Sequence, residues 1–349
     1  MRANPLRQAL SRLGLSQIRY VSAVRPGQSG DLVARVYQQM EDDFGVVAPP
    51  IALHAVAPEM LAASWSLLRE TLIVPGPASR LAKEAVATAV SAVNACPYCA
   101  MIHNSTLTLL GSRRPEEPGS SDPALDDVVE WVLSVERLDD GASLPFPESQ
   151  LPELAGVALL LHYLNRMVNV FLREVPLPPR VPEFALPAVL RLLGRVTAAP
   201  ARRAHPPGAA LAMLPSAELP ADLAWAAGNE TVAQAYARAT AAIDAAGVRS
   251  VPAEVRALVG EQLVQWRGGP RGISRSWVED LITRVATEQQ PVARLALLVA
   301  FASYQVDPSV IERCRQVGTD DRTLIELSSW AAMAAARRLG ELLSAHLTR

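Results

Sequence analysis

The sequence contains too few cysteines for a fold held together by disulfide bonds. Only three occur among 349 residues, Cys96, Cys99 and Cys314, whereas disulfide-stabilised secreted domains are short and dense in cysteine. Two of the three form a CxxC pair. An isolated pair of this kind indicates redox or metal chemistry in an intracellular setting.

The sequence also lacks a basic excess and a long apolar run. Lys and Arg number 33 against 35 Asp and Glu, a formal net charge of −2, whereas nucleic-acid and anionic membrane surfaces select basic proteins. The longest apolar stretches, residues 155–161 and 295–302, are far shorter than the ~20 residues that span a bilayer. The first residues lead into an amphipathic stretch, not an apolar signal core. We therefore expect a cytoplasmic protein that binds neither nucleic acid nor membrane.

Helical periodicity is abundant, and no segment alternates convincingly as a strand. In residues 59–74 apolar side chains recur at the i, i+4, i+7, i+11 spacing of one helix face; they are Leu61, Trp65, Leu68 and Leu72. The chain is long enough for one large core or two domains of ordinary size. The predicted fold class is all-α, with helices over residues 59–74, 80–94, 96–110, 126–137, 151–172, 188–197, 222–245, 253–266, 276–288, 292–304, 308–316 and 322–347.

Proline and glycine divide this helical chain into parts. Residues 113–123 (RRPEEPGSSDP) predict an exposed connector, and residues 176–220 are rich in proline around one short basic helix. We predict a first helical domain over residues 1–175, an interdomain segment over 176–220 and a second helical domain over 221–349.

A weak internal repeat relates the two predicted domains. Residues 60–76 align without gaps to residues 231–247, an offset of 171, and three extra residues then change the offset to 174. The polar motif described next has no counterpart in the second copy: opposite Glu84, Cys96, Cys99 and His103 stand Leu258, Pro270, Ile273 and Trp277. The second copy keeps the helical scaffold and has lost the reactive groups.

Residues 84–103 carry the candidate chemistry: Glu84, eleven residues, the CxxC pair, three residues and His103. The spacings i, i+3 and i, i+4 place both cysteines and the histidine on one helix face. Cys96 stands near the helix N-terminus, which stabilises a negative charge by roughly 0.3–1 kcal/mol. His103 is the nearest proton acceptor for a thiol, and Glu84 on the preceding antiparallel helix would orient the imidazole. The pattern predicts a reactive thiol pair.

With these residues in this order, the chain resembles the AhpD-like alkylhydroperoxidase branch of the carboxymuconolactone decarboxylase superfamily. The motif of that branch is Glu, eleven residues, CxxC, three residues, His, and all four positions match here. Residues 301–342 are also similar to the usual tail of the superfamily, and tandem units are known in it. The resemblance implies two AhpD-like helical units in tandem, and it does not imply lactone decarboxylation, because the decarboxylase members lack the CxxC pair.

The resemblance also implies roles for the site residues. It makes Cys99 the thiol that attacks the peroxide and becomes a sulfenic acid, and Cys96 the resolving thiol that closes the disulfide, although helix geometry by itself allows the reverse order. Some members carry a proton-relay histidine where this chain has Tyr98, which lowers the peroxidase efficiency that we expect. The implied reaction needs no cofactor and no metal, only an external thiol or protein reductant. Single-unit members commonly form trimers or hexamers, so we expect a homo-oligomer with fewer copies.

Two other interpretations of the cysteine pair remain open. One is half of a zinc site completed by His103 and Glu84, although structural zinc prefers a second Cys/His pair and rarely uses a carboxylate. The other is a purely structural pair of buried thiols, which would not account for the aligned histidine and glutamate.

Five polar or thiol residues outside the motif have simpler interpretations. We expect His54 to pack a loop and His162 to be a hydrogen-bonded core histidine. Arg166 and Arg337 stand at the repeat offset of 171, which predicts a shared structural salt bridge, and Cys314 is expected to be a lone thiol on a helix face.

The function predicted from the sequence is thiol-dependent reduction of hydroperoxides or disulfides through the CxxC pair. The alternative is a helical scaffold without catalysis, in which the pair senses redox state in an oligomeric assembly. A measured pKa of Cys99 separates the two, because a sensor thiol need not be ionised near neutral pH.

Overall fold

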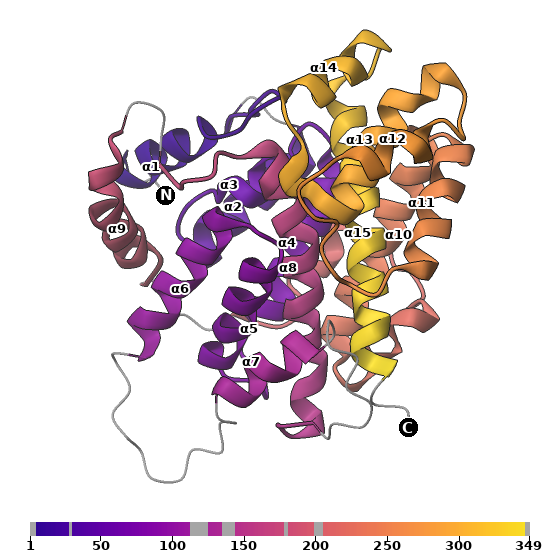
Figure 1. The fold of residues 1–349 in the computed structure, drawn as a ribbon. Helices are drawn as coiled ribbons and strands as arrows, with labels where there is room; N and C mark the ends of the chain where they lie inside the picture. Colours follow the sequence, from indigo (N-terminus) through magenta and orange to yellow (C-terminus); the bar gives the residue numbers. More distant parts are fainter. Residues whose placement is uncertain are drawn as a thin grey trace.

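The computed structural model describes residues 5–27, 30–111, 125–134, 144–177, 181–198 and 205–345. In this described part the regular secondary structure is helical, without a strand, which confirms the predicted all-α class (Figure 1). The helices are α1 (Pro5–Leu15), α2 (Asp31–Asp43), α3 (Pro49–Ala52), α4 (Pro58–Leu68), α5 (Arg80–Val93), α6 (Pro97–Gly111), α7 (Leu125–Ser134), α8 (Leu151–Phe171), α9 (Leu186–Ala198), α10 (Glu230–Ser250), α11 (Ala253–Gln265), α12 (Ser276–Ile282), α13 (Gln290–Ala302), α14 (Pro308–Gln316) and α15 (Asp321–Ala345).

Most helix boundaries agree closely with the predicted ones, and the differences have local causes. The helix predicted over residues 222–245 is interrupted, because Asn229 is extended and its side chain accepts from the backbone N–H groups of Thr231 and Val232. This cap starts α10 and separates it from the short helix η6 (Ala221–Gly228). The helix predicted over residues 59–74 continues beyond α4 as a π-helical turn, η1 (Arg69–Ile73). Helices α1, α2 and α3 were not predicted, and most of the connector 113–123 lies outside the described residues.

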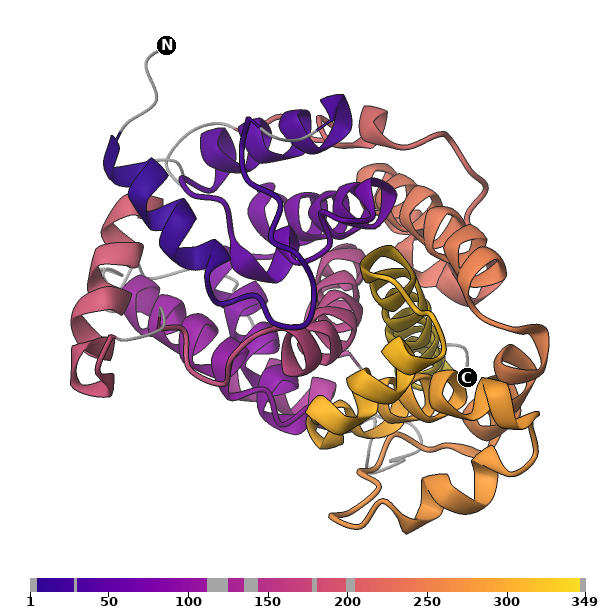
Figure 2. The ribbon, with the colours of Figure 1, turned by 90° about the horizontal axis from the view of Figure 1, so that it is seen from above.

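Helices from the two copies of the repeat pack against one another in the middle of the molecule. In Figures 1 and 2, α4 packs beside α10 and α8 packs beside α15. Helix order follows the repeat, because α4, α5, α6 and α8 correspond in sequence to α10, α11, α12 and α15. One continuous hydrophobic core contains side chains from both copies. The division at residues 175 and 221 stays a prediction.

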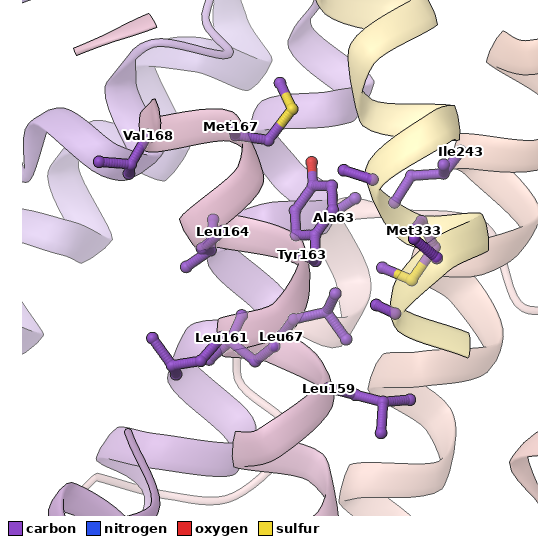
Figure 3. Close-up of a cluster of buried hydrophobic side chains, with 14 of the residues drawn as sticks. Ala63, Leu67, Leu159, Leu161, Tyr163, Leu164, Met167, Val168, Ile243 and Met333 are labelled. Atoms are coloured by element: carbon purple, nitrogen blue, oxygen red, sulfur yellow. The ribbon is translucent and has the colours of Figure 1, made fainter. Parts of the chain in front are cut away.

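Helix α8 occupies the centre of this core. Figure 3 shows Leu159, Tyr163 and Met167 of α8 directed toward side chains of the neighbouring helices, among them Ile243 of α10 and Met333 of α15. By length and composition, the segment 148–171 could cross a membrane, but 94% of its most apolar window is buried inside the protein. A helix buried to this extent is the central helix of a helical bundle.

The proline-rich segment is attached to the first copy by a buried ionic cluster. The guanidinium of Arg69 contacts Asp43 (2.6 Å) and Glu70 (2.7 Å). Glu70 in turn accepts hydrogen bonds from the backbone N–H groups of Gly208 and Ala210. Because Arg69 and Glu70 are almost completely buried, every charge in the cluster needs these partners. Residues 208–210 are therefore held in place against the π-helical turn.

Glu153, at the start of α8, fixes the beginning of α5. Its carboxylate forms a buried ion pair with Lys83 (2.8 Å) and accepts from the backbone N–H of Ala78. It also accepts from the side chain of Asn229. A Cβ at Gly76 would lie 1.7 Å from Glu153 Oε1, so this approach requires glycine. One carboxylate thereby joins both copies of the repeat to the helix that carries Glu84.

The hydroxyl group of Tyr163 is the centre of a second buried polar cluster. It lies 3.0 Å from Nε2 of His54, 3.1 Å from Oγ of Ser64 and 3.2 Å from Oγ of Ser329. His54 is fully buried, and its Nδ1 donates to the carbonyl of Ile51, as expected for a histidine that packs a loop. Burial lowers the pKa of His54 to about 4, although hydrogen bonds from its own loop oppose that change.

The lowered pKa of His54 predicts a pH-dependent stability. In the unfolded chain the imidazole binds a proton near pH 6.5, and in the folded protein only near pH 4. Between these values the unfolded state binds more protons, so the free energy of unfolding falls as the pH falls through this window. The loss approaches about 1.4 kcal/mol per pH unit for this one group. Urea unfolding of the wild type at several pH values measures it.

The His54→Gln variant isolates the contribution of His54 from that of other groups. His162, whose pKa is also lowered by burial, remains in this variant and contributes in the same direction. We expect a shallower pH dependence below pH 6.5 in His54→Gln, with the remaining slope due to other groups. Equal slopes in the variant and the wild type would contradict the assignment.

Candidate redox site

The turn between α5 and α6 places the cysteine pair at the start of a helix. The backbone N–H of Cys96 donates to the carbonyl of Ser91, and that of Ala95 donates to the carbonyl of Ala92. Together with the left-handed conformation of Ala95 (φ 49°), these bonds form a Schellman motif that ends α5. Helix α6 begins at Pro97, the position where a helix tolerates proline. Cys96 therefore stands at the N-cap of α6.

Helices α5 and α6 pack along each other and bring Glu84 to His103. Oε2 of Glu84 lies 2.7 Å from Nδ1 of His103, and Oε1 lies 2.7 Å from the guanidinium of Arg80. The carboxylate is fully buried, whereas His103 is partly exposed. Burial by itself would raise the pKa of Glu84, but the charges of Arg80 and His103 lower it to about 2. Glu84 is therefore ionised throughout the range in which thiols react.

The two cysteine sulfur atoms lie 2.7 Å apart without a disulfide bond between them. Cys96 is 1% exposed and Cys99 is 5% exposed. Burial raises the pKa of Cys99 well above its usual value, and the adjacent thiol of Cys96 adds to this effect. Within the described residues, no hydrogen bond joins His103 to either sulfur atom. The resting geometry therefore favours the neutral thiol of Cys99, and its thiolate forms only when a base removes the proton.

Tyr98 stands between the cysteines and is also buried. Burial raises the pKa of its hydroxyl group, and the two neighbouring thiols raise it further. The phenol stays protonated near neutral pH and cannot act as a base there, unlike an imidazole at this position.

Arg80 is a site residue that the sequence analysis missed. Its guanidinium pairs with Glu84 across one helical turn, donates to the carbonyl of Leu72, and is about one-third exposed. The i, i+4 spacing of an arginine and a glutamate on a predicted helix is a readable signal for such a pair. Arg80 leaves one carboxylate oxygen of Glu84 for His103.

The described part of the second copy contains no comparable arrangement. Ile273, opposite Cys99 in the alignment, is 96% exposed, and Trp277 packs its ring edge-on against Phe301. Cys314 is fully buried on α14 and donates to the carbonyl of Pro291. Throughout the described ranges, no three His, Cys, Asp or Glu side chains converge in a way that could hold a metal ion.

The salt bridge predicted for both Arg166 and Arg337 exists only at Arg337. That guanidinium pairs with Asp222 (2.7 Å) and Asp244 (3.0 Å). Arg166 instead donates to Asn94 and to backbone carbonyls. The prediction of a shared ion pair was wrong, because the first copy has no carboxylate in the corresponding place among the described residues.

Comparison with known proteins identifies a relative that matches almost the whole chain. The chain is 32% identical over 337 residues to the Mycobacterium tuberculosis (strain ATCC 25618 / H37Rv) protein named alkyl hydroperoxide reductase Rv2159c, covering 94% of this chain and 95% of that protein. No family model matches the sequence. No solved structure matches it either.

The left-handed Ala95 predicts that glycine at this position stabilises the protein. A left-handed conformation costs an L-residue roughly 1–2 kcal/mol, which glycine avoids. Glycine loses roughly 0.5–1 kcal/mol more backbone entropy on folding, so relief of strain is the larger effect. We expect Ala95→Gly to raise the free energy of unfolding by about 0.5–1 kcal/mol.

The matched control is Ala92→Gly, three residues earlier on the exposed side of α5. There the backbone is helical, and glycine should lower the free energy of unfolding by about 1 kcal/mol. Chemical denaturation measures both variants. A loss of stability in both would show that Ala95 is not strained.

Proposed function

The chain belongs to the AhpD-like alkylhydroperoxidase family, and from this we propose that it reduces organic hydroperoxides with its own cysteine pair. The observation that carries the proposal is the juxtaposition of two unbonded sulfur atoms, 2.7 Å apart, with an ion-paired His103 on the same helix and its buried partner Glu84 on α5. The relative from Mycobacterium tuberculosis, named an alkyl hydroperoxide reductase, supports the same chemistry.

The proposed reaction proceeds in three balanced steps. The thiolate of Cys99 attacks one peroxide oxygen, the O–O bond breaks, and the alcohol leaves with a proton. This oxidises Cys99 to a sulfenic acid. The thiol of Cys96 then attacks that sulfur, a disulfide forms and water leaves. Finally an external dithiol supplies two electrons and two protons and restores both thiols.

His103 is the base that we assign to the first step. Its Nδ1 is engaged by the ionised Glu84, so Nδ1 carries the proton and Nε2 is the basic nitrogen. Nε2 would accept the proton of Cys99 and return it to the departing alkoxide, and Glu84 would stabilise the imidazolium formed between these events. The burial that raises the pKa of Cys99 makes such a base necessary.

Cys99 is the better candidate for the attacking thiol. It is the more exposed of the two sulfur residues, 5% against 1%, and it lies one helical turn from His103. Cys96 is placed to resolve the sulfenic acid, because closing a disulfide of about 2.05 Å needs only a small movement from the observed separation. We propose that the reductant is an external thiol or protein. We also propose that the protein is cytoplasmic and forms a homo-oligomer.

A redox sensor is the second candidate function. The burial of both cysteines favours it, because a thiol that stays neutral reacts slowly and needs no turnover. Steady-state hydroperoxide consumption with a panel of thiol reductants separates the candidates. Multiple turnovers support the enzyme, whereas a single stoichiometric oxidation supports the sensor.

The proposed order of the thiols predicts different outcomes for the two serine variants. Cys99→Ser should abolish hydroperoxide reduction, a loss of at least about 1,000-fold. Cys96→Ser should allow one oxidation and stop at a sulfenic acid on Cys99, which a dimedone adduct detects by mass spectrometry. Cys314→Ser is the control and should keep full activity, because its thiol is buried on α14. An adduct on Cys96 in Cys99→Ser would reverse the order.

The proposed role of Glu84 predicts a change in the pH profile. Glu84→Gln removes the charge that stabilises imidazolium and keeps the shape of the side chain. We expect a slower reaction, by about 10- to 100-fold, with the reactivity rising at higher pH than in the wild type. Iodoacetamide alkylation rates against pH measure this shift. Glu261→Gln, which breaks an exposed ion pair with Arg284, is the control, and identical profiles for all three proteins would remove Glu84 from the mechanism.

A further inference from the structure

A cavity lies between the two copies of the repeat, beside the turn that carries the cysteines. The end of α5, helix α8, the loop after α11 and the end of α13 enclose it. Its polar lining includes Asn94, His162, Arg166 and Ser303. None of the described residues that line it is Asp or Glu. The lining therefore combines one fixed positive charge with neutral polar groups.

Arg166 is a buried cation without an anionic partner in the described part of the chain. It is 5% exposed, and its Nε and Nη1 donate to the carbonyl oxygens of Ala300 and His162 and to Oδ1 of Asn94. Nη2 makes no hydrogen bond within the described residues. Burial lowers the pKa of Arg166 to about 10, and no carboxylate offsets this. A buried charge of this kind is costly until an anion pairs with it.

His162 contributes a second hydrogen-bond donor, and the contacts of its Nδ1 indicate which ring nitrogen carries the proton. Nδ1 of His162 lies 3.1 Å from Nδ2 and 3.3 Å from Oδ1 of Asn94. We assign the shorter contact, in which Nδ2 donates, because Oδ1 already accepts from Arg166. Nδ1 of the imidazole must then accept, which places the proton on Nε2. Burial, and then the charge of Arg166, lower the pKa of His162, so the ring is neutral near pH 7. Nε2 has no hydrogen-bond partner among the described residues.

The remaining walls of the cavity are apolar and aromatic. Trp266 places its ring 5.8 Å from the guanidinium carbon of Arg166, and Phe301 and Leu339 line the same space. The volume of about 40 Å³ holds about three water molecules, the room that a carboxylate group needs. The half-exposed Tyr304 at its edge marks the side from which a ligand would enter.

We propose that this cavity binds a small organic monocarboxylate, whose carboxylate group pairs with Nη2 of Arg166 and Nε2 of His162. The site offers two N–H donors and the one positive charge of Arg166, which match the two oxygen atoms and the one negative charge of a carboxylate. The aromatic and aliphatic walls suit a short apolar tail. This proposal does not depend on the proposed thiol chemistry, because no cysteine is among the described residues that line the cavity. Binding of the carboxylate can be measured whether or not the cysteines react.

The repeat supplies an internal control for this proposal. Arg337 stands at the position equivalent to Arg166, and its charge is neutralised by Asp222 and Asp244. If a buried arginine in this position were needed only for packing, a carboxylate partner would be expected in both copies. Only the first copy leaves its guanidinium open to an exogenous anion.

The experiment titrates sodium propionate into the 349-residue chain at pH 7 and constant ionic strength, with binding followed by calorimetry and thermal unfolding. Saturable binding of one propionate per chain is expected for the wild type. Arg166→Met should weaken it at least tenfold. Val93→Phe should weaken it similarly, because Val93 lines the cavity and the larger ring fills it without removing a contact of Arg166. Arg337→Met should bind within twofold of the wild type.

Each outcome decides for or against the site. If Arg166→Met does not fold, as judged by circular dichroism, Val93→Phe provides the test on its own. Absence of saturable propionate binding to the wild type would overturn the proposal. Equal affinity in the wild type and Val93→Phe would also overturn it, and inorganic phosphate binding in preference to propionate would reject the organic carboxylate.

Discussion

The arrangement of this protein depends on the polar side chains of one helix that is buried on every side. Helix α8 lies in the centre of the core, yet it carries Glu153, Tyr163, Arg166 and Asn169. A buried polar group without a partner costs roughly 1–3 kcal/mol, so each of these groups fixes the position of its partners. Glu153 fixes the start of α5, and Arg166 and Asn169 hold Asn94 at its end. Asn94 is two residues from Cys96, so the redox site is attached to α8 through this contact.

Two opposing electrostatic effects meet within that site. Burial disfavours the thiolate of Cys99, whereas the same burial strengthens the interaction between Glu84 and His103, because the local dielectric constant is low. Arg80 keeps the carboxylate ionised despite its burial. In this site the negative charge therefore lies on Glu84, and the thiol of Cys99 is neutral. In the proposed mechanism, ionisation of Cys99 is then a proton transfer to His103 and not a property of the isolated thiol.

The sequence predicted those features that depend on local spacing. The helices followed from apolar periodicity, and the proximity of Glu84 to His103 followed from two antiparallel helices joined by a short turn. Arg80 was readable at i, i+4 from Glu84 and was overlooked. The break at Asn229 was missed because capping competes with a helical pattern that continues on both sides. The cavity around Arg166 could not be predicted, because its walls come from residues that are far apart in the sequence and meet only when the two copies pack together.

The two copies of the repeat carry different polar side chains on one helical scaffold. Where the first copy has its redox motif, the second has Pro270, Ile273 and Trp277, and the loop that contains Pro270 forms one wall of the cavity beside the α5–α6 turn. The same asymmetry appears at Arg166 and Arg337, where one guanidinium is open and the other is neutralised. A single unit would have no such wall, because α11 and the loop that follows it belong to the second copy. The second copy, which lacks the reactive groups, therefore supplies part of the surroundings of the copy that has them.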